Sequence, residues 1–449
     1  MTKILDVDEL VNSQKLGPLT FRLLVLSFLA MMADGYDILA LAYAAPDIMR
    51  QWHVGRAAFG GVFSAGLLGI LIGAPLLGHL GDRFGRKSMI VAGSIIYGVG
   101  TLGIVVAGSL SVLTALRFLA GVGIGGVMPS TVALNAEFAP RRWRATLIIL
   151  MFTGITLGGA LPGWFATNLI PLYGWKVLFA IGGAAPLAIG FLLAALLPES
   201  IKFLAQVPRR REKLAAVLRQ FNPPVLLSEA TQIRAGTETV ASASAANLFA
   251  GTLAAVTPLL WLLFATNLMA TYFLNSWMPT LFGLSGVTAG QSAQALSVFQ
   301  IGGTLGGIVV SVLLDRFGMI PIIALFVLAG PAVLALGTAG DSVSGLMSAA
   351  GAAGFCVLGL QFGLNAISGI IYPTSIRAKG SGWAFAIGRF GSIIGPVAGG
   401  FLLSLHLSLR QLLFAPAVFL ATGAVAAVAM LVLCRKHLGH LRLDEFPLA

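Results

Sequence analysis

Long runs of hydrophobic residues dominate the chain, and short polar segments separate them. Each run is near the ~20 residues that a helix needs to cross the hydrocarbon of a bilayer. Twelve such runs can be counted, at residues 25–43, 57–79, 88–107, 110–134, 145–168, 175–197, 257–282, 292–314, 320–337, 346–372, 380–403 and 411–433. This pattern predicts an all-α membrane protein with twelve transmembrane helices.

The composition agrees with a membrane-embedded chain. Of the 449 residues, 57% are hydrophobic and only 10% are charged, whereas about a quarter of a soluble domain is charged. The 56 glycines suit close packing between helices in lipid. A water-soluble core is therefore not expected.

The net charge of +12 follows the predicted topology. If the N-terminus is cytoplasmic, 22 Lys and Arg residues fall on the cytoplasmic side and only 4 fall outside. The four outer cations are Arg50, Arg56, Lys176 and Arg410. This asymmetry places both termini in the cytoplasm. Because the excess charge marks topology, we expect no nucleic-acid partner.

Three landmarks of the first half of the chain recur 233 residues later. Asp82 in a Gly-Asp-Arg-Phe-Gly run matches Asp315, Arg144 matches Arg377, and Pro46 matches Pro279. Two six-helix halves in parallel orientation are therefore predicted. The segments are a cytoplasmic N-terminal segment, the first half, a cytoplasmic linker, the second half and a cytoplasmic tail: 1–20, 21–197, 198–256, 257–434 and 435–449.

Two short segments flank the first span. Residues 6–16 could form an amphipathic helix on the inner surface, and Pro46, Asp47, Trp52 and His53 are expected in an external loop after the first helix. Because residues 1–20 carry acids where a signal peptide would carry a basic start, the first helix is expected to be retained. Neither Cys356 nor Cys434 lies in an external loop, so no disulfide framework is indicated.

The first span contains two acids, in the run Asp34-Gly35-Tyr36-Asp37. An acid at the centre of a membrane helix costs about 2.5–3.5 kcal/mol on an insertion scale. Such residues face the protein interior or a wet cavity and mark ion and substrate pathways. At i and i+3 both acids share one helix face. A structural ion pair or a misjudged helix end is the alternative reading.

Several motifs resemble those of a known transporter superfamily. The charged turn 78–87 and the Gly/Pro run 154–163 are similar to signature motifs of the major facilitator superfamily, and this resemblance covers essentially the whole chain. Residues 34–37, 117–130 and 376–391 resemble motifs of its aromatic acid–proton symporter family. Lys379 and His79 depart from the family pattern, where a small hydroxyl residue and a Pro are expected.

Proton coupling is assigned to Asp34 and Asp37. Desolvation favours the protonated form of a carboxyl and a nearby Arg favours the carboxylate, so a switch between these environments loads and releases protons. At 1.5 Å per residue, Arg117 in the fourth span lies at a height comparable to both acids. Arg117 could pair with an Asp or bind a substrate carboxylate in a bidentate fork. Arg389 is the second cation for an anion.

Further substrate contacts are predicted from the resemblance, which places the first, fourth, seventh and tenth helices around a central cavity. Ring stacking is assigned to Tyr36 and Trp277, and hydroxyl binding to Asn275, Gln361 and Asn365, with Asn267 as a further polar group. The alternatives are structural: Arg117 could brace helices, Arg389 could latch a gate, the amides could join helices, and Trp277 could lie at the membrane interface.

A cytoplasmic set of charges is predicted to gate transport. By resemblance these residues form pairs between the halves that hold the outward-facing state: Asp82, Arg83, Arg86, Glu137, Arg144, Asp315 and Arg377, with Lys87 and Arg141 nearby. Topology anchoring is the alternative for the cations. Acids add little to topology, which favours gating for Asp82 and Glu137.

The expected function is proton-coupled import of a benzoate- or hydroxybenzoate-like carboxylate across the inner membrane. Two alternatives stay within transport: a symporter of another organic acid, and a proton-driven exporter of drugs or metabolites. A membrane enzyme or sensor would need a catalytic constellation or a signalling domain, and neither is visible. The glycine runs lack a Walker pattern and no His spacing suits zinc, so no nucleotide, metal or cofactor is expected.

Overall fold

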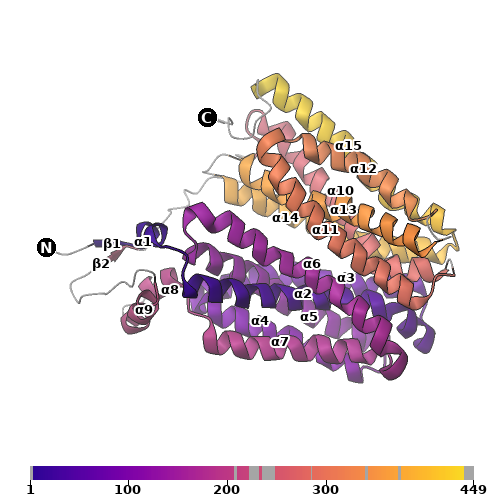
Figure 1. The fold of residues 1–449 in the computed structure, drawn as a ribbon, viewed down its shortest axis with the longest axis horizontal. Coiled ribbons are helices and arrows are strands. Elements are labelled where there is room, and N and C mark those ends of the chain that lie inside the picture. Colours follow the sequence, from indigo (N-terminus) through magenta and orange to yellow (C-terminus); the bar gives the residue numbers. More distant parts are fainter. Residues whose placement is uncertain are drawn as a thin grey trace. The chain divides into compact units, whose positions relative to one another are not determined.

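The computed structural model describes residues 4–206, 210–221, 232–234, 248–284, 286–338, 342–372 and 376–438. Long helices make up nearly all of this part of the chain (Figure 1). The elements are β1 (Ile4–Asp6), α1 (Val7–Ser13), α2 (Pro18–Trp52), α3 (Arg56–Phe84), α4 (Arg86–Gly103), η1 (Ile104–Val106), α5 (Leu110–Phe138), α6 (Arg141–Tyr173), α7 (Lys176–Leu196), α8 (Ile201–Gln206), α9 (Arg211–Leu218), β2 (Gln232–Arg234), α10 (Leu253–Leu284), α11 (Ala289–Phe317), α12 (Ile320–Ala335), α13 (Val343–Ile370), α14 (Arg377–Ser404) and α15 (Leu409–Leu438).

The all-helical membrane architecture is confirmed. Among the described residues, 11 helices are long and apolar enough to cross a membrane. The helix α12 has 16 residues, which span about 24 Å at 1.5 Å per residue, less than the ~30 Å of a hydrocarbon core. The count of exactly twelve spans therefore stays a prediction.

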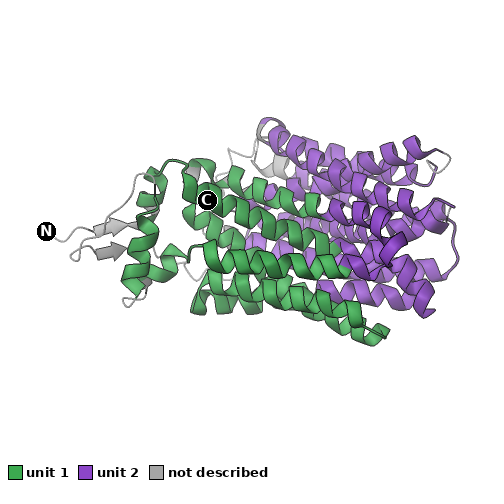
Figure 2. Ribbon diagram, turned by 60° about the horizontal axis from the view of Figure 1, so that its bottom comes forward, with its two compact units in different colours: residues 1–38, 68–158, 179–239 green, residues 39–67, 159–178, 240–449 purple. Residues whose placement is uncertain are grey.

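Contacts group the chain into two units (Figure 2). Unit 1 comprises residues 1–38, 68–158 and 179–239, and unit 2 comprises residues 39–67, 159–178 and 240–449. The division falls within α2, α3, α6 and α7, so it differs from the division into sequence halves at 21–197 and 257–434. The sequence halves stay a prediction.

Glycines let helices of unit 1 approach closely. A Cβ at Gly35 of α2 would overlap the backbone of Ile155 in α6, and a Cβ at Gly158 of α6 would overlap the backbone of Met32 in α2. Small residues replace bulky side chains at such crossings because backbone contact supplies the packing energy in lipid.

Unit 2 repeats this device. A Cβ at Gly391 of α14 would overlap the carbonyl of Ala265 in α10, and a Cβ at Gly354 of α13 would overlap the backbone of Phe299 in α11.

Helix starts are set by hydroxyl caps: Thr288 and Gln291 form a capping box at α11, and Ser342 accepts from the backbone N–H of Gly345 at α13.

The predicted external loop after the first helix was wrong. Pro46 and Asp47 lie inside α2, which continues to Trp52, because Ile48 and Met49 are buried and Trp52 packs edge-on against Trp175, with 5.7 Å between ring centroids. Within the charged segment 78–87, by contrast, the chain reverses sharply at a glycine as predicted: only Gly85, at φ 102°, separates α3 from α4.

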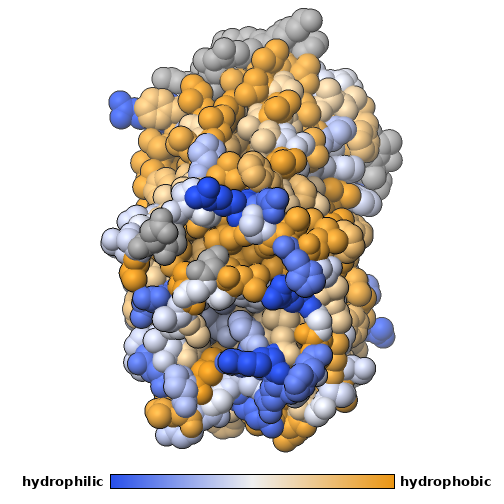
Figure 3. Space-filling model, turned by 90° about the vertical axis from the view of Figure 1, so that its right-hand side faces the viewer, coloured by the Kyte–Doolittle hydropathy of each residue, from blue (hydrophilic) through white to orange (hydrophobic). Residues whose placement is uncertain are grey.

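The linker is more ordered than its composition suggested. It contains α8 and α9, and β2 within it pairs in parallel with β1. Residues 6–16 contain the helix α1, in which Val7 and Val11 are buried. On the face drawn in Figure 3, hydrophilic side chains gather in patches between hydrophobic ones.

Candidate functional site

Both acids of α2 are fully buried in unit 1, each with no exposed surface. The motif around them is explained by packing. Gly35 admits the α6 backbone, and the Tyr36 ring covers Gly182 of α7, where a Cβ would come within 2.8 Å of it. Asp34 and Asp37 therefore sit at a position that neighbouring helices fix closely.

Asp37 is held by two partners from different helices. Its Oδ2 lies 2.9 Å from Nη1 of Arg117 in α5, and the same Nη1 also donates to the Asp37 carbonyl at 3.3 Å. The Thr101 hydroxyl of α4 donates to Oδ1 of Asp37. With 5% of its surface exposed, Arg117 forms a buried ion pair. The predicted similarity in height of Arg117 and Asp37 is confirmed by this contact.

Asp34 has a different environment. In the described part of the chain neither of its carboxylate oxygens has a hydrogen-bond partner. The side chain of Tyr97 in α4 lies next to it, without the geometry of a formed hydrogen bond. Tyr97 precedes Thr101 by one helical turn, so these two α4 residues face Asp34 and Asp37 one turn apart.

Polar residues of unit 2 link helices to one another. Asn267 of α10 donates to Gln361 of α13 at 3.0 Å, and Gln361 donates to Asn365 at 2.9 Å. Gln300 of α11 donates to Asn275 of α10 at 2.8 Å. These amides do join helices. The Asn267 carbonyl oxygen is nevertheless buried without a partner among the described residues.

Trp277 is completely buried, which excludes a place in the lipid-facing interface. Its indole N–H donates to the Pro396 carbonyl at 2.8 Å, and its ring packs edge-on against Phe63. Arg389 lies half-buried within α14. These residues all belong to unit 2, whereas Asp34 and Asp37 belong to unit 1.

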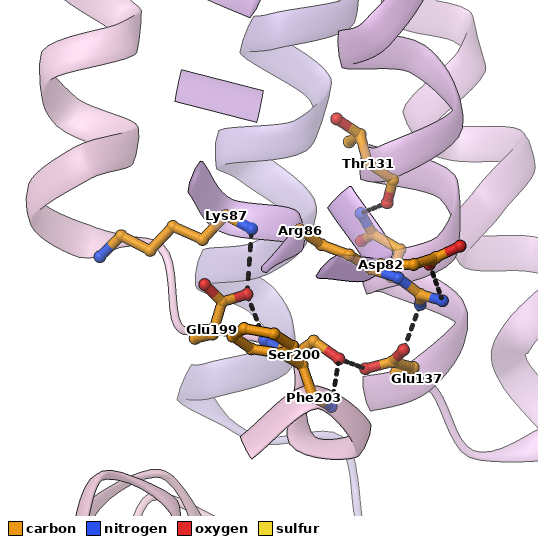
Figure 4. A network of polar contacts seen from close by, with 9 residues as sticks. Asp82, Arg86, Lys87, Thr131, Glu137, Glu199, Ser200 and Phe203 are labelled. Atoms are coloured by element: carbon orange, nitrogen blue, oxygen red, sulfur yellow. Dashed lines mark hydrogen bonds and ion pairs between the residues drawn. The ribbon is translucent and has the colours of Figure 1, made fainter. Parts of the chain in front are cut away.

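A second polar network lies at the ends of α3, α4, α5 and α7 (Figure 4). Arg86 pairs with Glu137 and more loosely with Asp82, at 3.8 Å. Ser200 donates to Glu137 at 2.5 Å and accepts from the backbone N–H of Phe203. All five residues come from unit 1.

Glu199 extends this network to the start of α4. Its Oε1 accepts from the backbone N–H of Lys87 at 3.1 Å and from that of Ser200 at 2.9 Å. Gly85 has no side chain to cap α4, and a Cβ at Gly85 would overlap the Glu199 carboxylate. An anion at a helix N-terminus is stabilised by the exposed N–H groups and the helix dipole.

The remaining predicted gating residues are not in this network. Arg83 is exposed and lies over the Phe84 ring, 5.5 Å from its centroid. Arg144 donates to the Ala139 carbonyl at 3.3 Å. The side chains of Asp315, Arg377 and Arg141, and of Cys434, lie outside the described part of the chain.

Sequence reasoning missed Tyr97, Thr101, Glu199 and Ser200. Tyr97 and Thr101 stand at i and i+4 in the third hydrophobic run, and their shared face was the available signal. Glu199 and Ser200 follow Pro198 directly after the sixth run, where an acid has no topological use. That position alone could have marked them.

A model of the Major Facilitator Superfamily matches residues 23–367 and, again, residues 260–442. The chain belongs to the major facilitator superfamily. The predicted family is therefore confirmed, and the protein is a transporter of this superfamily.

Two similar proteins and one solved structure extend this result. The 4-hydroxybenzoate transporter PcaK of Pseudomonas aeruginosa is 38% identical over 94% of this chain and 95% of its own. The gallate transporter of Pseudomonas putida is 36% identical over 99% and 97%. A bacterial homologue of the human lysosomal transporter Spinster shares the superfamily fold, with a TM-score of 0.71 at 17% identity over 97% of this chain and all of its own.

Proposed function

We propose that this protein imports small aromatic carboxylates together with protons. The observation that carries the proposal is the buried cluster of unit 1, in which two acids and one arginine sit in membrane-spanning helices. Charges at such depth are costly and mark ion and substrate pathways. The similar proteins, matched over nearly their full length, carry 4-hydroxybenzoate and gallate by name, which supports the substrate class.

Arg117 is assigned to the substrate carboxylate. Its guanidinium can bind a carboxylate through two parallel hydrogen bonds, and in the ion pair with Asp37 it already holds one carboxylate at 2.9 Å. An incoming anion competes with Asp37 for the same donors, which couples substrate binding to the acid pair. Arg389 is the second cation proposed to meet the anion.

The aromatic ring and its substituents are assigned to other groups. Tyr36 lies in the same turn as the acids, and Asn275, Trp277, Gln361 and Asn365 are the proposed contacts from unit 2. Amides can both donate to and accept from a ring hydroxyl. The cytoplasmic charges, Asp82, Arg83, Arg86, Glu137, Arg144, Asp315 and Arg377, are proposed to gate the inner side.

Proton coupling follows from the energetics of anion uptake. An inside-negative membrane opposes the entry of one negative charge by about 2.3 kcal/mol per 100 mV. One accompanying proton cancels this penalty, and more than one makes the potential drive uptake. We place the protein in the inner membrane with both termini in the cytoplasm, because its cations gather on that side.

Uptake by purified protein in liposomes tests the proposal. Labelled 4-hydroxybenzoate, gallate and benzoate should accumulate when an inwardly directed proton gradient is imposed, and a protonophore should abolish accumulation. Unlabelled aromatic acids should compete, whereas short aliphatic acids should not. Accumulation of aliphatic acids alone would contradict the proposal. Movement of the substrate only out of the vesicle, in the direction opposite to the inward proton gradient, would contradict it as well.

A further inference from the structure

The two acids of α2 are three residues apart, but their partners divide them sharply. Asp37 has an arginine on one oxygen and a threonine hydroxyl on the other. Asp34 has neither, and both of its oxygens lack a hydrogen bond to any described residue. Because a paired carboxylate is stable in its charged form and an unpaired buried one is not, the two acids are suited to different tasks.

The charged and titratable groups near Asp34 come from three helices. Its own helix brings Asp37, α4 brings Tyr97, and α5 brings Arg117, which is bonded to Asp37. The helices α6 and α7 approach α2 through Gly158 and Gly182, and neither carries an acid or a base beyond its first turn. Tyr97 is therefore the neutral hydroxyl group that is placed to interact with Asp34.

Tyr97 is held firmly. It is 1% exposed, and its backbone packs on Gly123 of α5, where a Cβ would come within 2.6 Å of the Tyr97 nitrogen. A phenol can either donate or accept one hydrogen bond. It can thus serve Asp34 in both protonation states, which a phenylalanine cannot.

We propose that Asp34 carries the exchangeable proton, that Tyr97 is its positioning residue, and that Asp37 stays a charged carboxylate, held by Thr101 and, until the substrate competes for it, by Arg117. The inference rests on the proposed proton coupling and extends it to named roles. In the charged state the Tyr97 hydroxyl donates to the Asp34 carboxylate. When a proton from water forms the O–H bond of Asp34, the Tyr97 oxygen accepts from it. The proton later returns to water from Asp34, and Tyr97 loses none.

Infrared difference spectroscopy of the purified protein during a pH titration tests this without any substrate. A protonated carboxyl gives a carbonyl band that disappears on ionisation. The band should be lost in Asp34→Asn. It should persist in the double variant Asp37→Asn/Arg117→Gln, which removes both charges of the pair and so leaves no unpaired charge behind.

The positioning role has its own readout. Tyr97→Phe removes a donor to the charged form, so the midpoint of the band should move to higher pH by about one unit, as expected for one hydrogen bond. Tyr43→Phe is the matched control, because it removes a different buried phenol, one that belongs to unit 2 and whose hydroxyl contacts the Gly159 carbonyl. Its midpoint should equal that of the wild type.

The outcomes separate the two proposals. A band that survives in Asp34→Asn, or a midpoint in Tyr97→Phe equal to that of the wild type, overturns the inference. If the band behaves as expected and the wild type accumulates no aromatic acid, the proposed function fails and the proton site stands. In active protein, Asp34→Asn should lose gradient-driven accumulation while keeping exchange of labelled for unlabelled substrate.

Discussion

Arg117 and Asp37 depend on each other for their place in the fold. Removing one partner of a buried pair leaves the other charge desolvated, which costs about 3–5 kcal/mol. We expect Arg117→Gln to lower the free energy of unfolding by about that amount. The double variant Asp37→Asn/Arg117→Gln should recover much of the loss. Denaturant unfolding in detergent measures both, and equal losses in the two proteins would show that the pair does not act as a unit.

The predicted gating role of Asp82 can be tested separately from any effect of this residue on stability. Its side chain is 74% exposed and lies 3.8 Å from Arg86, and exposed ion pairs contribute about 0–1 kcal/mol. Asp82→Asn should therefore leave folding and membrane insertion unchanged but block transport, if the residue gates the inner side. The measurement is uptake normalised to protein in the membrane.

The exposed pair of Asp47 with Arg50 supplies the control for this experiment. Asp47→Asn removes a comparable surface contact at the end of α2, so uptake should be kept. Normal uptake by Asp82→Asn would refute the gating role, whereas loss in both variants would mean that any change of an acid near a helix end is harmful.

At the scale of elements, the glycine crossings decide how close the helices lie. Gly158→Ala in α6 would drive a methyl group into the Met32 backbone of α2. Gly78→Ala in α3 meets nothing within 4 Å. Alanine is favoured over glycine within a helix by about 1 kcal/mol, so Gly78→Ala should stabilise and Gly158→Ala should destabilise the protein. Thermal unfolding of the two variants distinguishes them, and equal shifts would argue against a close crossing.

Most elements were accessible from the sequence because hydrophobic length sets the span of a membrane helix. Their ends were less accessible. The first helix runs past Pro46, since burial of Ile48 and Met49 outweighs the signal of a proline, and in membranes neighbouring helices satisfy the backbone groups that a proline frees. The helices α8 and α9 lie in a segment of weak periodicity, so their existence depends on contacts formed only in the folded chain.

The candidate site, like the helices, could be predicted from the sequence only in part. Asp34, Asp37 and Arg117 stand out because charge is rare in hydrophobic runs. Tyr97 and Thr101 do not, since hydroxyl groups are common in membrane helices and only the position of a neighbouring helix makes them relevant. Which of the two acids Arg117 meets was also open, because residue counting fixes height along a helix and leaves the rotation about its axis undetermined.

At the scale of the whole molecule, the distribution of cations predicts the orientation of the chain in the membrane, and this orientation can be tested. In a background where Cys356 and Cys434 are replaced by serine, Gly108→Cys introduces a thiol between η1 and α5, and Lys213→Cys introduces one in α9. Both positions are exposed. A membrane-impermeant maleimide should label the first in intact cells and the second only after permeabilisation. The reverse pattern would invert the topology.

The start of α4 is completed by a residue far along the chain. The Lys87 amide and the Glu199 carboxylate that accepts its hydrogen bond are 112 residues apart. During synthesis, α4 therefore leaves the ribosome with its first turn uncapped, and remains so until α7 has been made. Three further helices, α5, α6 and α7, must therefore be synthesised before the hydrogen bond that caps the inner end of the α3–α4 hairpin can form. A substitution at Glu199 would accordingly impair biogenesis more than it would alter the kinetics of the finished protein.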